Sequence, residues 1–293
     1  MDNDLTSRSG GRPSRFDIRA YSAAIQVGVV AMQVVAVANL AYLVMHIVHD
    51  IVHGEQTAPP IAMAFGLVLL SGVPWLAVAF VQRRLAATFD IEKEHWVLSL
   101  RRARIEIPPG SVKSIRPFLV PLPGSGLLVT MNSGRTFRLG VDEPGALLAS
   151  LAGAFEPARG AALRPEVAYA DAKRRYGQRW RYLTVTKWLI LPLLIALVLF
   201  RLDQYIVFGG PFGQYQMFGL GPYLKSFATY WVGTTSYLVI YASVVRICVE
   251  LLAILVTSIA PLRAGVVRRI AEGLCLLMYF GLIPAYIAVR LLL

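Results

Sequence analysis

Long apolar runs alternate with polar, basic segments along this chain. A bilayer core about 30 Å thick needs roughly 20 mostly apolar residues in a helix. Five runs meet or approach that length, at residues 21–48, 60–81, 183–200, 227–260 and 270–292. The pattern therefore predicts a mainly α-helical integral membrane protein with about five transmembrane helices.

The pattern changes between the second and third runs, where short stretches typical of β-strands are separated by turn residues. The predicted strands are residues 88–93, 96–101, 104–107, 114–120, 126–131 and 136–141. Clusters of Pro, Gly, Asn and Ser lie between them, as in the turns of a small β domain. Asp142 is then placed to cap a helix in which Leu147, Leu148 and Leu151 share one face. We expect an inserted β domain over residues 83–156.

This segment resembles the bacterial pleckstrin-homology-like (PH-like) domains of membrane proteins. The resemblance rests on residues 89–91, 104–108, 114–115, 137–139 and 142–144. It implies a β-sandwich or barrel that is capped by a helix and used for docking rather than for chemistry. It implies no catalytic residues.

The Lys and Arg bias of the connecting segments predicts the topology. The tail carries several Arg residues, the first loop has no Lys or Arg, and the β domain and the turn before the last run are basic. We therefore expect a multi-pass protein of the bacterial inner membrane with a cytoplasmic N-terminus and a periplasmic C-terminus. The predicted parts are a basic tail (1–20), a transmembrane hairpin (21–82), the PH-like domain (83–156), a basic linker (157–182) and three further helices (183–293) with an external loop (202–226).

Composition supports this class, because 56% of residues are hydrophobic and 16% are charged. The net charge of +12 lies mainly beside apolar runs, so nucleic acid is not an expected partner. One basic cluster precedes the third run and is expected to contact anionic lipid head groups, or else to serve only as a topology signal. Its members are Lys173, Arg174, Arg175, Arg179 and Arg181.

Three of the four histidines lie close together at the end of the first predicted helix. His46, His49, Asp50 and His53 fall on one helical stripe. Imidazoles and a carboxylate at this spacing are typical ligands of zinc, copper or iron, so the stripe is a candidate metal or haem site. The alternative is that these side chains face water at the interface or pack against another helix.

Arg246 and Glu250 form the second candidate site, four residues apart within the fourth predicted helix. Charges at such depth are costly, so the two are expected to face protein and to pair with each other. The pair is either a structural clamp, with Glu272 included, or part of a proton or ion pathway.

The preferred function is a non-enzymatic accessory, assembly or scaffold subunit that docks partners through the PH-like domain. Neither a phosphate-binding loop nor a Gly-x-Ser-x-Gly elbow is present, which leaves hydrolase chemistry without a nucleophile. The expected partners are membrane lipids and other membrane proteins or further copies of the chain. The alternatives are a metal- or haem-binding redox protein that uses the histidine stripe, and a channel or transporter subunit that uses Arg246 and Glu250.

Overall fold

The computed structural model describes residues 15–54, 60–92, 95–101, 103–153, 155–177 and 183–285. The chain divides into two compact units. The sheet unit comprises Met1–Val30, Val78–Arg175 and Ile254–Val267. The helical unit comprises Ala31–Ala77, Tyr176–Ala253 and Arg268–Leu293.

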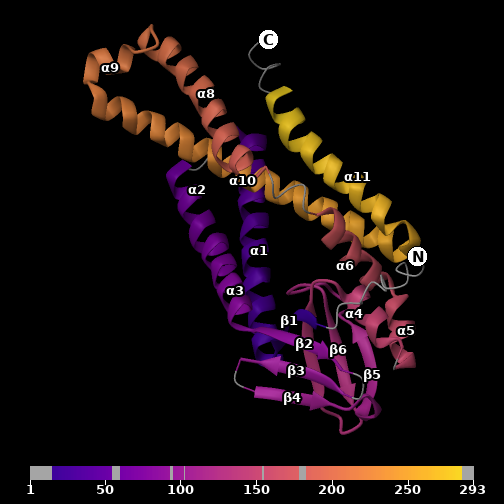
Figure 1. The fold of residues 1–293 in the computed structure, drawn as a ribbon. Helices are drawn as coiled ribbons and strands as arrows, with labels where there is room; N and C mark the ends of the chain where they lie inside the picture. The colour runs from indigo at the N-terminus through magenta and orange to yellow at the C-terminus, as the bar shows by residue number, and fades with distance from the viewer. Residues whose placement is uncertain are drawn as a thin grey trace, which may run out of the picture. The chain divides into compact units, whose positions relative to one another are not determined.

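The sheet unit contains a curled antiparallel sheet of seven strands within the described residues (Figure 1). In chain order the strands are β1 (Arg15–Tyr21), β2 (Ala86–Ile91), β3 (Trp96–Leu100), β4 (Ala103–Ile107), β5 (Val112–Pro117), β6 (Gly126–Met131) and β7 (Thr136–Val141). Their order across the sheet is β4-β3-β2-β1-β7-β6-β5. Strands that neighbour each other in the sheet are consecutive in the chain, except at the centre, where β1 pairs with β7 as well as with β2.

β1 corrects the sequence-based interpretation, which predicted six strands and left residues 15–20 in a basic tail. Phe16 pairs with Phe89 of β2, and Ile18 pairs with Val141 of β7. Phe16 and Ile18 are buried in the core while the intervening residues are more exposed, which is the alternation of a half-buried strand. The tail therefore supplies the central strand of the sheet.

One face of the sheet is covered by short helices. These are α4 (Pro144–Leu151), α5 (Glu156–Ala162) and α6 (Pro165–Tyr176), and the 3₁₀ turn η2 (Pro109–Ser111) joins β4 to β5. The predicted apolar face of α4 is buried in a core with Trp96 and Leu127 of the sheet. Asp142 accepts two hydrogen bonds from the Arg19 guanidinium, at 3.0 and 3.3 Å, which ties the end of β7 to β1.

The two strands at the centre of the sheet continue directly into long helices. Only Ser22 separates β1 from α1 (Ala23–His53), and only Leu85 separates α3 (Val73–Arg84) from β2. The Ala20 N–H donates to the Leu85 carbonyl at 3.2 Å, so the two junctions are held side by side. The first helical residues of α1 and the last of α3 thus belong to the sheet unit.

Four helices in the described part of the chain are long and apolar enough to cross a membrane. They are Ala23–His53, Ile61–Arg84, Thr186–Phe208 and Leu220–Ile259. The second helix is made up of α2 (Pro60–Leu67), the π turn η1 (Val68–Gly72) and α3. The third is made up of the π turn η3 (Thr186–Ile190) and α8 (Leu191–Phe208), and the fourth is α10. At 1.5 Å per residue, the 40 residues of α10 span about 60 Å, about twice the hydrocarbon thickness.

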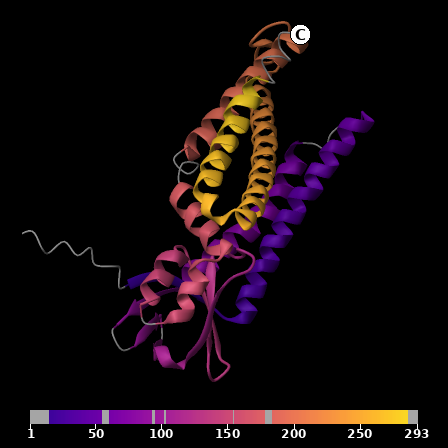
Figure 2. The ribbon, with the colours of Figure 1, turned by 90° about the vertical axis from the view of Figure 1, so that its right-hand side faces the viewer.

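The fifth predicted span corresponds to α11 (Ala264–Leu277) and the π turn η5 (Met278–Leu282), which follow the 3₁₀ turn η4 (Pro261–Arg263). Its last residues lie outside the described part of the chain. Figure 2 shows α11 beside α10. Val245 and Val249 of α10 pack there against Ala271 and Cys275 of α11.

The π turns leave backbone carbonyls without their ordinary helical donors, and side chains of neighbouring helices supply replacements. Asn39 Nδ2 lies 3.4 Å from the Gly66 carbonyl, next to η1, and 2.8 Å from Ser71 Oγ. The Tyr279 hydroxyl donates to the Lys187 carbonyl of η3 at 2.8 Å. The Tyr241 hydroxyl donates to the Met278 carbonyl of η5 at 3.2 Å. These hydrogen bonds connect α1 to the helix Ile61–Arg84, and they connect the helix that contains η5 to both Thr186–Phe208 and α10.

Candidate functional site

Four charged side chains form a compact cluster between α10 and α11. Arg246 and Glu250 lie one turn apart on α10, and Arg268 and Glu272 lie one turn apart on α11. Each helix therefore presents one Arg and one Glu at an i,i+4 spacing, on faces that meet because the apolar cluster above joins the same helices.

The contacts cross between the helices as well as running along them. Arg246 Nη2 lies 2.9 Å from both Glu250 Oε1 and Glu272 Oε1. Arg268 donates to both oxygens of Glu250, at 2.7 and 2.9 Å, and its Nη2 lies 2.6 Å from Glu272 Oε1. Two cations and two anions thus neutralise one another.

Burial is uneven within the cluster. Arg268 and Glu272 are each 2% exposed, whereas the side chains of Arg246 and Glu250 are 25% and 18% exposed. A charge taken out of water is tolerated when it is paired and hydrogen-bonded, so the α11 pair depends most on its partners. The ion pairs therefore link α10 to α11 with balanced charge, which both the clamp and the pathway hypotheses allow.

Sequence reasoning identified Arg246 and Glu250 and suggested Glu272, but it assigned Arg268 to the basic turn that marks topology. The structure instead gives Arg268 three close contacts inside the cluster. The missed signal is the i,i+4 spacing of Arg268 and Glu272, which repeats that of Arg246 and Glu250. Lys187 is a second buried cation, 2% exposed, and its ammonium lies 4.8 Å from the centre of the Trp188 ring.

The histidine stripe lies in the last turns of α1. His46 Nδ1 lies 3.0 Å from the buried Asp50 carboxylate, and His49 Nδ1 lies 3.8 Å from its other oxygen. His53 Nδ1 is 2.9 Å from the His49 carbonyl, and the rings of His49 and His53 stack with centroids 4.1 Å apart. The stripe is thus an internally hydrogen-bonded cluster on one helix.

Across the described residues, no group of three or more His, Cys, Asp or Glu side chains is arranged to hold a metal ion. The structure therefore brings the four predicted ligands near one another without converging three of them on a point. The metal and haem hypotheses for this stripe stay predictions.

The predicted lipid-binding cluster is divided by the structure. Lys173, Arg174 and Arg175 form the last turn of α6, while Arg179 and Arg181 lie outside the described residues. Arg174 Nε donates to Glu143 at 3.3 Å, within the sheet unit. This residue therefore has a protein partner in addition to any lipid.

Residues 202–226, predicted as an external loop, are mostly helical. α8 continues to Phe208, α9 covers Gly213–Phe218, and α10 begins at Leu220 rather than at residue 227. Gln204 is fully buried and exchanges two hydrogen bonds with Gln214, at 3.0 and 3.2 Å. The predicted helix breaks are present at Gly209 and Gly219, where φ is positive, and the segment between them is a packed hairpin tip.

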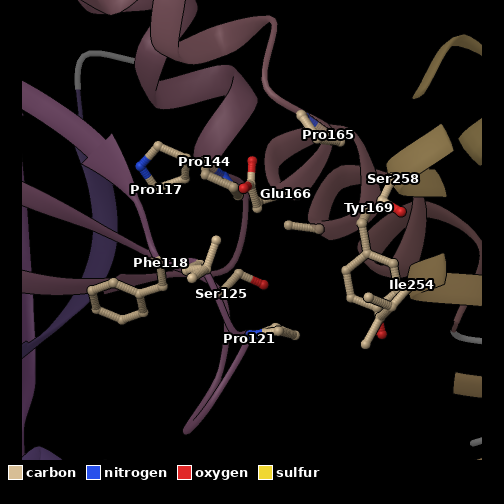
Figure 3. Close-up of a pocket in the computed structure, with 13 residues that line it drawn as sticks. Pro117, Phe118, Pro121, Ser125, Pro144, Pro165, Glu166, Tyr169, Ile254 and Ser258 are labelled. Carbon is tan, nitrogen blue, oxygen red and sulfur yellow. The ribbon is translucent and has the colours of Figure 1, made fainter. Parts of the chain in front are cut away.

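A small cavity of about 170 Å³ lies within the sheet unit (Figure 3). Its walls come from the loop between β5 and β6, from α6 and from the last turns of α10. Most lining groups are apolar, and the carboxylate of Glu166 contributes a buried oxygen without a hydrogen-bond partner among the described residues. The residues of the β5–β6 loop in this wall include Phe118, Leu119 and Pro121.

Comparisons with family models, with curated proteins and with solved structures found no match for this chain.

Proposed function

We propose that this protein is a non-enzymatic accessory or scaffold subunit of the bacterial inner membrane, whose PH-like sheet unit docks a partner in the cytoplasm. One observation carries the proposal: β1 and β2, at the centre of the sheet, join α1 and α3 through single residues. The sheet unit is therefore attached to these helices through hydrogen-bonded strands and not through a flexible linker. A partner bound to the sheet would therefore be held close to the membrane helices.

Two features support the PH-like assignment. The curled seven-stranded sheet of the described residues and the helix α4 that packs on its core are of the kind the resemblance implies. The strand missing from the sequence-based assignment, β1, adds to this sheet, with α1, α2, η1 and α3 inserted between β1 and β2.

Four long apolar helices support membrane embedding, and the Lys and Arg bias supports a cytoplasmic sheet unit. Arg83 and Arg84 end the span that enters β2. The proposed topology places the N-terminus in the cytoplasm and the C-terminus in the periplasm, with the hairpin tip around α9 on the periplasmic side.

The edge strand β4 is the docking surface that the sheet offers. Among the described strands β4 and β5 form the two edges of the sheet, and of these β5 is contacted by α5. An unpaired edge can accept an extended peptide as a further strand. Arg104 and Glu106, both exposed on β4, would set the charge preference for such a peptide. Another membrane protein or a second copy of the chain would supply it.

A photo-crosslinking amino acid at Arg104 tests the docking proposal in native membranes, with the same group at Ser133, in the turn between β6 and β7, as the control. We expect a discrete adduct from position 104 that position 133 does not give. An adduct of twice the chain mass would identify a second copy as the partner. Absence of a specific adduct at position 104 would contradict docking at β4.

Cysteine accessibility tests the topology, after Cys248 and Cys275 are replaced by Ser. A membrane-impermeant maleimide added to intact spheroplasts should label a cysteine at Met217, which is exposed in α9, and should spare one at Ser133. Permeabilised cells should show both labelled. Reversed accessibility would refute the proposed orientation.

A further inference from the structure

The loop between β5 and β6 exposes an unusual set of apolar side chains. Leu119 is 81% exposed, Val120 is 55% exposed and Leu122 is 38% exposed, whereas Phe118 is buried and anchors the loop. Loop tips are ordinarily polar, and contiguous exposed apolar side chains mark sites of contact with a partner or a membrane.

The position of this loop within the sheet unit is set by α3. Gln82 Nε2 donates to the Pro123 carbonyl at 3.2 Å. Gln82 directly precedes Arg83 and Arg84, which end the apolar helix Ile61–Arg84 and are exposed. Basic residues at the end of a span lie at the level of the lipid head groups. In the proposed topology the loop would therefore lie at that level too.

The cavity in the sheet unit also brings the loop near the end of α10. Figure 3 shows the cavity with Pro121 and Ser125 of the loop on one side and Tyr169 and Ile254 on the other. Ile254 and Ser258 come from the last turns of α10, another apolar span, in the part that belongs to the sheet unit. The loop thus lies near the ends of two spans.

The backbone of the loop suits a place with little water. The Phe118 N–H donates to the Gly126 carbonyl at 2.9 Å, and the Leu122 N–H donates to the Val120 carbonyl at 2.8 Å. Pro121 and Pro123 have no N–H group to satisfy. Because an unpaired N–H is costly to bury, these four positions lower the cost of placing the loop at the lipid boundary.

From these observations we propose that the β5–β6 loop inserts Leu119, Val120 and Leu122 into the cytoplasmic leaflet of the bilayer. The occupant of this apolar surface is therefore the acyl-chain boundary of membrane lipids, with Arg83 and Arg84 placed to contact anionic head groups. The sheet unit then has a lipid contact of its own in addition to its two helical junctions. This inference rests on the proposed membrane embedding and orientation.

The test uses the full-length protein without native cysteines, reconstituted into vesicles of phosphatidylethanolamine and phosphatidylglycerol. An environment-sensitive fluorophore is attached to a single cysteine at Leu119, at Ser133 as the water-exposed control, or at Phe65 of α2 as the bilayer control. The quencher is a phospholipid with a nitroxide near the top of its acyl chain. We expect blue-shifted emission and loss of fluorescence at 119, and neither at 133.

The outcomes distinguish a failure of loop insertion from a failure of the proposed membrane embedding. Quenching at 65 with a label at 119 that behaves like 133 would refute insertion and leave the membrane assignment intact. No quenching at 65 would refute the membrane embedding itself. A blue shift at 119 without quenching would show that protein covers the loop, which also overturns the proposal. Val120→Asp should abolish the quenching at 119 by placing a charge among the inserted side chains.

Discussion

Replacement of Arg268 by Met tests the clamp between α10 and α11 at its most buried cation. Arg268 is 2% exposed and makes three close contacts to Glu250 and Glu272, whereas Arg246 makes two and is 25% exposed. The substitution keeps an apolar side chain of similar length but leaves two carboxylates with one guanidinium. A buried net charge of −1 results, with no counter-ion at the lost position.

The expected cost follows from that imbalance. Breaking a buried ion pair by removing one partner destabilises a protein by about 3–5 kcal/mol. At 1.36 kcal/mol per decade, this corresponds to roughly two to four orders of magnitude in the unfolding equilibrium constant. Arg246→Met should cost less, because this guanidinium is more exposed and water can partly solvate the carboxylates that lose it. Arg263→Met, at an exposed Arg in the neighbouring turn, should change stability by less than about 0.5 kcal/mol.

The assay is unfolding of the purified protein in mixed micelles, followed by far-UV circular dichroism as SDS is added. Arg268→Met combined with Glu272→Gln restores charge balance and should recover much of the loss. If Arg268→Met is as stable as Arg263→Met, the clamp is refuted.

The same variants separate a clamp from a working charge. A clamp predicts that the balanced double variant regains function together with stability. A proton or ion pathway predicts a double variant that is stable yet fails to complement a deletion strain. Full complementation by the stable double variant would exclude the pathway.

Three further predictions concern single contacts. Gly145→Ala should cost about 1–3 kcal/mol, because the new Cβ would overlap the Asp171 carboxylate, which accepts a hydrogen bond from the backbone N–H of residue 145. Gly160→Ala is the control, because the space around this residue of α5 is open, and thermal melts should show it to be neutral or slightly stabilising. Burial raises the pKa of Asp171 above its ordinary 3.8, so its charge lowers stability at neutral pH. The fold should gain stability as the pH falls through the raised pKa towards 3.8, and the melting temperature of Asp171→Asn should not show this gain. Tyr279→Phe should cost about 0.5–1.5 kcal/mol, because it removes the hydroxyl that donates to the Lys187 carbonyl of η3. Tyr205→Phe, at an exposed ring, should cost nothing measurable, and equal SDS unfolding midpoints for the two variants would show that the Tyr279 hydrogen bond does not stabilise the helices.

Local pattern alone was enough for several parts of this protein. Runs of apolar residues predicted five spans, and four of these are long apolar helices in the described part of the chain, because a span needs only length and composition. Alternating side chains and turn residues predicted β2 to β7 to within a few residues, and the spacing of leucines predicted the buried face of α4. In each case the information lies within a window of about 20 residues.

Tertiary structure decided what depends on distant residues. Arg15–Tyr21 is a central strand only because it pairs with residues 86–90 and 138–141, and a short basic segment next to a span has the same local signal as a topology determinant. Arg263, Arg268 and Arg269 look equivalent in the sequence, yet only Arg268 lies on the face of α11 that meets α10, and it is buried while the other two are exposed. The environment of a charge is set by the packing of helices far apart in the chain, so composition and spacing place the charge without showing whether it meets water, lipid or a partner of opposite sign.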